Sequence, residues 1–324
     1  MAGERKVCVT GCNGFIGSWI VRALLEKGYI VHGTYAPGTS TDHLRSLPGA
    51  DTRLVLTEAD LLDANAFQAP IQGCIGVFHV ASPCTLATPK DPELELIQPA
   101  VQGTMNVLQA VAASAATVRR VVITASISSL IPNPSWAARN QPVDETSWTD
   151  VEYCKAHNEW YPLSKTLAEK AAWDFAAKNG IDMVTIHPST CIGPLLQPGL
   201  NASSAVLLNL LQDSPDTQGD HFLGCVHVRD VADAQVLAFE TPNASGRYLC
   251  TNGIYQFKHF AEKVAELCPQ YPVHRFSKDT QPGLVACKDA AKRLIDLGLV
   301  FRPIEEAVKD AVESFKANGL LKGQ

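Results

Sequence analysis

Three residues in this chain have the types and spacing needed to act on a carbonyl group. Tyr161 and Lys165 lie four residues apart in Trp160-Tyr-Pro-Leu-Ser-Lys, which opens an expected helix. That spacing puts both side chains on one helix face, about 6 Å apart along the axis. An ammonium there stabilises the phenolate, lowers the tyrosine pKa and makes the phenol a better proton donor near neutral pH. Ser126, just after an expected strand, could hold the carbonyl oxygen by a second hydrogen bond.

A glycine-rich stretch near the amino terminus supplies the second half of that chemistry. Residues 7–10 are a short run of β-formers, glycines follow at 11, 14 and 17, and helical periodicity continues to Gly28. Glycines allow a sharp bend and a close approach to a pyrophosphate, which then faces the amino end of the helix. Either signal alone also arises by chance. Together they favour hydride transfer from a nicotinamide to a carbonyl that Tyr161 protonates.

The elements that must position these residues alternate along the chain. β-prone runs at 30–35, 53–56, 75–80, 120–125 and 182–187 are separated by helix-like segments at 63–70, 94–116 and 167–179. Such alternation implies right-handed crossovers and a parallel sheet with helices on both faces. The predicted fold class is therefore α/β, a Rossmann-type doubly wound parallel sheet.

The carboxyl-terminal part of the chain has a different texture. Prolines and glycines interrupt 188–199, a helix is expected over 202–211, and further elements at 226–240 and 247–251. We expect a smaller substrate-binding lobe that closes a cleft over the carboxyl edge of the sheet. The predicted dinucleotide-binding domain comprises residues 1–188 with 226–245, and the lobe comprises 189–225 with 246–324.

Composition excludes several classes of partner. The net charge of -6 and the absence of any basic cluster longer than Arg119-Arg120 argue against nucleic acid and anionic membranes. No apolar run is long enough to cross a bilayer. Ten scattered cysteines without a CxxC pair, and no secretory signal, indicate reduced thiols in the cytoplasm. His79, His187 and His227 lack zinc-site spacing and are interpreted as hydrogen-bonded core or cleft residues, so no metal is expected.

The residues that would contact the adenosine half of the cofactor follow the second and third strands. Thr34-Tyr-Ala-Pro is neither acidic, as NAD sites favour, nor basic, as NADP sites favour. Residues 38–41 could donate to a 2′-phosphate, with charge from His32, His43 or Arg45, or could form an ordinary polar turn. Asp60 could accept from the adenine amino group, or be a solvated loop acid.

Several long segments resemble one known family, the extended short-chain dehydrogenase/reductases, and within it the plant cinnamoyl-CoA reductase-like, dihydroflavonol reductase and cinnamyl aldehyde reductase group. The segments are VCVTGCNGFIGSW, EADLLD, GVFHVASP, PAVQGTMNVL, WYPLSKTLAEKAAW, IGPLLQP, VHVRDVADA and SGRYLC. The resemblance implies NADPH as cofactor and an aromatic phenylpropanoid substrate, with Ser126, Tyr161 and Lys165 as catalytic residues. It also leaves Asn106 either as a relay residue or as a structural helix residue.

The expected cofactor contacts are Gly11, Gly14, Phe15, Ile16, Gly17, Asp60, Leu61, Ala81, Ser82, Tyr161, Lys165 and Pro188. Ile131, Trp136 and Cys225 either wall the substrate pocket or take part in ordinary packing.

The chain departs from the cinnamoyl-CoA reductase pattern in ways that bear on its ligands. Pro162 replaces a cysteine that would pair with Cys154, so that pair cannot form. Val206 and Asn209 replace a histidine and a lysine thought to contact CoA, although Arg247 is retained. These changes favour a free aldehyde over a thioester. Ala36 replaces the usual arginine after the second strand, which should weaken NADP preference and leaves NADH possible.

Three functions are compatible with these residues. The favoured one is an NADPH-dependent reductase that converts a hydroxycinnamaldehyde-like aldehyde to its alcohol. The second is reduction of a hydroxycinnamoyl-CoA to the aldehyde by the same residues. The third is a nucleotide-binding sensor or partner-binding protein with little catalysis, which the altered loop at Ala36 suggests and the intact serine, tyrosine and lysine set opposes.

Overall fold

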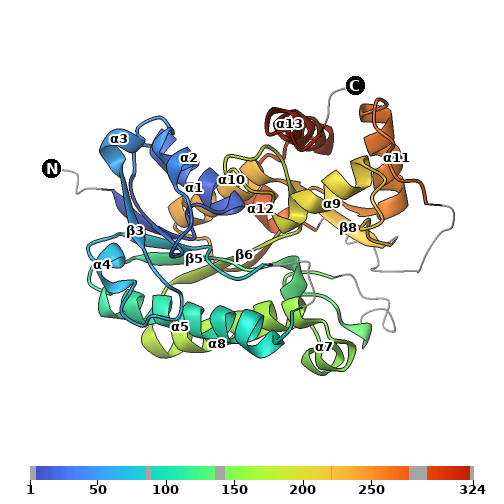
Figure 1. Cartoon of the computed structure of the whole chain (residues 1–324). Helices are drawn as coiled ribbons and strands as arrows, with labels where there is room; N and C mark the ends of the chain where they lie inside the picture. Colours follow the sequence, from blue (N-terminus) through green and yellow to red (C-terminus); the bar gives the residue numbers. More distant parts are fainter. Residues whose placement is uncertain (1–4, 85–88, 136–142, 220, 277–289, 322–324) are drawn as a thin grey trace.

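A seven-stranded parallel sheet forms the centre of the chain (Figure 1). The computed structural model describes residues 5–84, 89–135, 143–219, 221–276 and 290–321. In spatial order the strands are β3 (Leu54–Glu58), β2 (Ile30–Tyr35), β1 (Lys6–Thr10), β4 (Gly76–His79), β5 (Arg120–Thr124), β6 (Met183–Pro188) and β9 (Gly246–Cys250). The predicted Rossmann-type fold is confirmed. The strand order reverses between β1 and β4, where open α/β sheets bind ligands.

Helices cover both faces of this sheet (Figure 1). On one face α5 (Gln98–Ala113) packs against α8 (Trp160–Asn179), and on the other α1 (Phe15–Glu26) packs against α10 (Val228–Glu240). The connections carry short helices and turns: α2 (Asp42–Arg45), α3 (Ala50–Arg53), α4 (Gln68–Ile71), η1 (Glu93–Ile97), η2 (Ile127–Ser129) and α7 (Val151–His157).

The smaller lobe is built on a second sheet of three strands. Its strand order is β10 (Ile254–Gln256), β8 (Phe222–His227) and β7 (Thr190–Ile192). The other elements of this part of the chain are α9 (Ala202–Leu211), α11 (Phe257–Leu267), α12 (Lys292–Asp296) and α13 (Ile304–Ala317). The boundary predicted at residue 246 places β9 in the lobe, whereas β9 pairs with β6 as the edge strand of the large sheet. Because of this pairing, β9 belongs to the large sheet, and composition alone does not reveal such a pairing.

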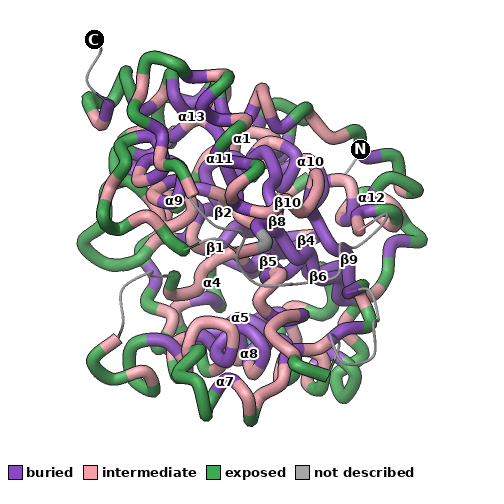
Figure 2. Tube along the Cα trace, turned by 90° about the vertical axis from the view of Figure 1, so that its right-hand side faces the viewer, coloured by how far each residue is buried: buried purple, intermediate pink, exposed green. Residues whose placement is uncertain are grey.

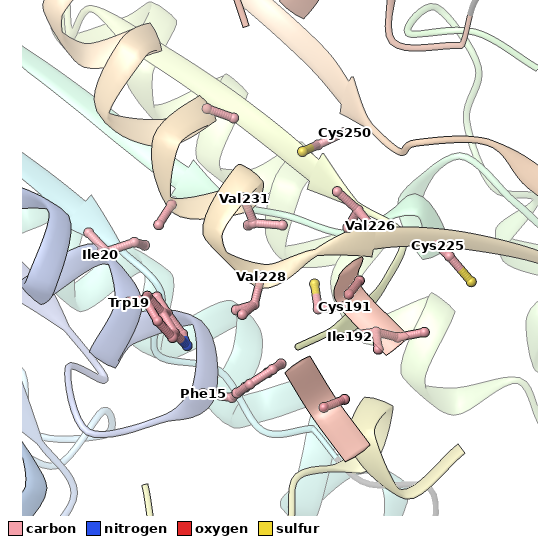
Figure 3. Close-up of a cluster of buried hydrophobic side chains, with 14 of the residues drawn as sticks. Phe15, Trp19, Ile20, Cys191, Ile192, Cys225, Val226, Val228, Val231 and Cys250 are labelled. Atoms are coloured by element: carbon pink, nitrogen blue, oxygen red, sulfur yellow. The ribbon is translucent and has the colours of Figure 1, made fainter. Parts of the chain in front are cut away.

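One continuous core joins the sheet to the lobe (Figure 2). Figure 3 shows Trp19 of α1 and Val228 of α10 on one side, with Ile192 of β7 and Cys225 of β8 on the other. All belong to a single cluster of buried side chains, so the lobe is held against the nucleotide-binding sheet by packing and not only by the connecting chain. None of the helices within the described ranges has the length and apolarity to cross a bilayer.

The helix predicted over residues 63–70 is wrong for most of its length. Only α4, at its end, is helical. The Asp60 carboxylate accepts from the backbone N–H of Leu62, and the Asp63 carboxylate accepts from that of Asn65, both at 2.9 Å. An aspartate carboxylate that accepts from the backbone N–H two residues later favours a turn over a helix. These two hydrogen bonds therefore account for the turns in place of the predicted helix.

Arg120, at the start of β5, holds the end of α10, the helix that leads into β9. This buried side chain pairs with Asp182 at 2.9 Å and donates to the carbonyls of Ala238, Thr241 and Pro242 at the end of α10. Arg120→Met should lower the free energy of unfolding by about 2 kcal/mol or more, because three carbonyls lose their donor. Denaturant titration measures the change. The matched control is Arg119→Met at the exposed neighbour, and an equal loss in both variants would contradict this assignment.

Candidate active site

The three residues expected to act on a carbonyl come together at the carboxyl edge of the sheet. Helix α8 begins at Trp160, so Tyr161 lies in its first turn and Lys165 one turn further along. The Lys165 ammonium donates to the Thr124 carbonyl at the end of β5, at 3.1 Å. Ser126 follows two residues later, and its hydroxyl lies near enough to that of Tyr161 to lower the pKa of the phenol. A strand end and a helix start thus supply the three groups to one place.

The pKa of Tyr161 differs from the sequence-based expectation. Burial raises it well above the ordinary phenol value, Cys84 raises it further, and the hydrogen bond from Ser126 opposes the rise. Burial also lowers the pKa of Lys165, against the opposing influence of Cys84 and Glu169. The expected lowering by Lys165 therefore does not dominate, because desolvation disfavours both charged forms. The phenol remains protonated near neutral pH, the form a proton donor requires.

The glycine turn has the shape that a dinucleotide site requires. Gly11 has a φ of +62°, and a Cβ there would lie 2.9 Å from the Cα of Ala81. A Cβ on Gly17 would lie 2.1 Å from the Gly11 carbonyl oxygen. Helix α1 then begins at Phe15, and its cap residue Gly14 makes no side-chain capping bond. The free N–H groups of this helix end face the cleft and suit an anion.

A cleft of about 720 Å³ runs along this edge of the sheet. Nine of the twelve expected cofactor contacts line it: Gly11, Gly14, Phe15, Ile16, Gly17, Asp60, Leu61, Ala81 and Ser82. Lys165 lines a small adjoining cavity of about 20 Å³, which Ala81 and Ser82 also border. Pro188 is buried at the end of β6, paired with Cys250 of β9. The size of the cleft and the buried, unpartnered Ser82 hydroxyl fit a dinucleotide.

The adenosine end of the cleft contains one residue that the sequence did not single out. The Asn13 side-chain amide donates to the Thr39 hydroxyl at 2.8 Å and to the Ser40 carbonyl at 3.0 Å, fixing the loop after β2. Ala36 lines the cleft on this loop. The loop therefore offers hydroxyl and backbone groups where the resemblance led us to expect an arginine.

The side chain of Asn106 makes two hydrogen bonds that support the loop after β3. Its amide donates to the Leu61 carbonyl at 2.8 Å and its oxygen accepts from Gln102. This buried bond holds the loop after β3, on which Asp60 and Leu61 line the cleft. Of the two roles left open for Asn106, support of the loop is the one its contacts favour.

Of the three predicted substrate residues, two pack in hydrophobic clusters and the third lies outside the described residues. Cys225 is fully buried and belongs to the core of Figure 3, and Ile131 packs against the cluster around Leu130. Trp136 lies outside the described residues. The cleft is bordered on this side by Pro83, which directly follows the expected contact Ser82, and by residues that sequence reasoning missed: Cys84, Pro99, Leu200, Asn201, Ala202 and Ser203.

The strand histidines make the hydrogen bonds expected of them. Thr10 accepts from the N–H groups of Val80 and Ala81, so its own proton goes to Nδ1 of His79 at 2.8 Å. His79 then donates from Nε2 to the Thr104 hydroxyl at 3.0 Å. Burial, with the charge of Lys165, lowers the pKa of His79 to about 3. A neutral imidazole thus ties together the ends of β1 and β4.

His227 belongs to the one group in the described part of the chain whose spacing would suit a metal ion. Its companions are Glu306 and Asp310. Nδ1 of His227 accepts from the Arg229 N–H, which leaves the proton on Nε2, directed to Asp310 at 3.4 Å. Arg229 also pairs with Asp310. A capping histidine and an arginine-neutralised carboxylate account for the group without an ion.

Arg247 is not placed to contact a CoA moiety. Its buried guanidinium pairs with Glu169 at 2.8 Å, donates to the carbonyls of Glu145 and Ser147, and lies 3.8 Å from the centre of the Trp148 ring. Its retention therefore reflects a structural role.

Comparison with known proteins identifies the family. Residues 7–250 match the model of the NAD dependent epimerase/dehydratase family. The chain belongs to this family. Within it, the chain is an extended short-chain dehydrogenase/reductase of the plant cinnamoyl-CoA reductase-like group, as predicted from the motifs.

Relatives of this reductase match it over nearly the whole length. It is 42% identical to cinnamoyl-CoA reductase 2 of Medicago truncatula, over 98% of this chain and 94% of the relative. It is 40% identical to tetraketide alpha-pyrone reductase 1 of Arabidopsis thaliana, over 98% of this chain and 97% of the relative.

Solved structures share the fold. Vestitone reductase from alfalfa superposes with a TM-score of 0.84 at 33% identity, over 98% of this chain and 99% of that one. Gre2 from Candida albicans, solved in complex with NADPH, superposes with a TM-score of 0.83 at 31% identity. The match covers 97% of this chain and 99% of that one. The predicted enzyme class, a short-chain reductase, is confirmed.

Gly17 provides a test of the turn. Gly17→Ala should destabilise the protein by about 2 kcal/mol or more, because the new Cβ would collide with the Gly11 carbonyl, and should weaken dinucleotide binding about tenfold or more. Thermal unfolding and fluorescence titration with NADPH measure the two effects. Gly14→Ala is the control for stability, since its Cβ would meet the same carbonyl at 3.4 Å, an ordinary contact. Similar melting of both variants would refute the steric argument.

Proposed function

We propose that this chain is an NADPH-dependent reductase of aromatic phenylpropanoid-type carbonyl compounds, which converts a hydroxycinnamaldehyde-like aldehyde to its alcohol. The observation that carries the proposal is that Ser126, Tyr161 and the buried Lys165 lie together at the edge of the dinucleotide cleft. Nine described cysteines are free thiols, which supports a reducing, cytoplasmic location.

The residues of the site have separate tasks in this reaction. NADPH, when bound, supplies a hydride to the carbonyl carbon. Ser126 donates a hydrogen bond that orients the carbonyl oxygen, and Tyr161 hands its phenolic proton to that oxygen as negative charge develops. Lys165 holds the nicotinamide ribose and stabilises the phenolate left behind. Its anchorage to the Thr124 carbonyl keeps the ammonium directed toward this edge of the sheet.

The assignment of NADPH rests on the cleft and on the relatives. The turn at Gly11, Gly14 and Gly17 admits a pyrophosphate, and Gre2, a neighbour at 31% identity, was solved in complex with NADPH. With Ala36 in the arginine position, the Asn13-braced loop at 39–40 is the part of this chain that would face a 2′-phosphate.

The preference for an aldehyde rests on the groups available near α9. Val206 is buried in the core and Asn209 is uncharged, with its side chain directed to the Asp216 carbonyl. Arg247 is held by Glu169. These residues leave few cations for the phosphates of CoA. The second candidate, reduction of a hydroxycinnamoyl-CoA thioester, is favoured by the names of relatives such as cinnamoyl-CoA reductase 2.

Tyr161 tests the chemistry. Tyr161→Phe should lower kcat by about a hundredfold or more while NADPH binding is retained, because only the transferred proton is lost. NADPH oxidation with a panel of aromatic aldehydes measures the first effect and fluorescence titration the second. Tyr153→Phe, on the neighbouring helix α7, is the control. Full activity of the Tyr161 variant would remove the phenol from the mechanism, and no turnover by the parent enzyme would favour the sensor function.

The substrate question is decided by a matched pair of compounds. For one ring substitution, kcat/KM for the free aldehyde should exceed that for the CoA thioester by about tenfold or more, since a missing charged contact is worth over 1 kcal/mol. Initial rates of NADPH oxidation at equal concentrations provide the ratio. A thioester reduced faster than its aldehyde would establish the second candidate instead.

A further inference from the structure

A buried carboxylate lies one helical turn beyond the catalytic lysine. Glu169 is four residues after Lys165 on α8, so both project from the same face of the helix. Its side chain is almost fully buried and accepts from His187 Nε2 at 2.9 Å and from Arg247 Nε at 2.8 Å. Burial raises the pKa of Glu169, but the His187 and Arg247 contacts outweigh it and hold the pKa well below the ordinary carboxyl value. The group is an anion throughout the working pH range.

A small cavity connects this anion to the lysine. The cavity of about 20 Å³ is bordered by Lys165, Glu169, His79 and the hydroxyl-bearing Thr104 and Thr124. That volume accommodates one water molecule, and the lining offers the several polar partners that a buried water needs. An ammonium has three N–H donors. One goes to the Thr124 carbonyl and, in the proposed reaction, one to the cofactor ribose, which leaves one for the cavity.

Several other titratable groups lie around the lysine and could influence its charge. Those that face the Lys165 and Glu169 pair are Tyr161 on α8, His79 on β4, Cys84 after β4, His187 on β6, Cys191 on β7 and Arg247 on β9. His79 is neutral, and burial raises the pKa of the Cys191 thiol well above its usual range. Of the groups that raise the pKa of Lys165, Cys84 has the larger influence and Glu169 the smaller, and Glu169 is itself paired with His187 and Arg247.

We propose that Glu169 is a positioning residue: acting across the small cavity that both side chains line, its negative charge helps to keep the Lys165 ammonium protonated and thereby raises the upper pH limit of the reaction. The inference rests on the proposed reductase function for its consequence, but the charge coupling itself is a property of the folded chain. Arg247, on the far side of the carboxylate, partly screens this charge.

The experiment measures the protonation of Lys165 without requiring turnover. Trace labelling with a small acetylating reagent over a pH series, followed by mass spectrometry of the peptide, reports where the neutral amine appears. Glu169→Gln removes the anion and should lower the labelling midpoint of Lys165 by about one pH unit. Arg247→Gln removes the screening cation and should raise it. A purely structural role would not move the two variants in opposite directions.

Kinetics then separates this inference from the proposed function. The basic limb of the kcat/KM profile for reduction should shift with the labelling midpoint in each variant. Trp173→Phe is the control, because it removes a hydrogen bond to the same carboxylate at 3.2 Å and keeps the charge. Unchanged midpoints in the Glu169 and Arg247 variants would overturn the inference. Shifted midpoints without turnover of any carbonyl would refute the proposed function alone, and if Glu169→Gln fails to fold, the upward shift in Arg247→Gln decides.

Discussion

The site depends on keeping a charged ammonium inside the protein. Burial disfavours the charged form of Lys165, so the surrounding chain must supply compensating groups. The Thr124 carbonyl is one of them. Cys84 and the anion at Glu169 also favour the charged form, and Glu169 is itself stabilised by His187 and Arg247. Strands β5, β6 and β9 thus each contribute to the environment of one lysine. The parallel sheet positions the chemistry through these contacts as much as through the cleft at its edge.

Much of the fold could be predicted because apolar periodicity reports burial directly. Strand β2 and helix α9 have the predicted bounds, Ile30–Tyr35 and Ala202–Leu211. The prediction was wrong where polar side chains bond the local backbone, as Asp63 does at the start of the stretch expected to be helical and Asp60 does just before it. It also misplaced β9, since membership of a sheet depends on a pairing between segments about sixty residues apart, which no local pattern records.

The site was predictable to the extent that its residues share a local motif. Tyr161 and Lys165 are neighbours on one helix face, so their spacing in the sequence already implies their proximity. The contacts of Lys165 with Thr124 and of Glu169 with Arg247 join distant segments, and only the folded chain shows them. The pKa of Tyr161 was anticipated with the wrong sign, because the spacing reveals the neighbouring charge but not the depth of burial.

Arg247 matches the family pattern in sequence, but its contacts in this structure are with the protein and leave it badly placed to bind CoA. A guanidinium has five N–H donors, and in this chain both ends of the fork engage the Glu169 carboxylate while Nη1 donates to the carbonyls of Glu145 and Ser147. Its flat face lies against Trp148. The side chain thereby joins the catalytic helix to the segment that contains Glu145, Ser147 and Trp148. To reach a CoA phosphate, it would have to abandon a buried carboxylate, and an uncompensated buried charge is strongly destabilising. In the proposed reaction the arginine therefore acts through the charge of Glu169, and its contacts argue against a role in binding a CoA phosphate.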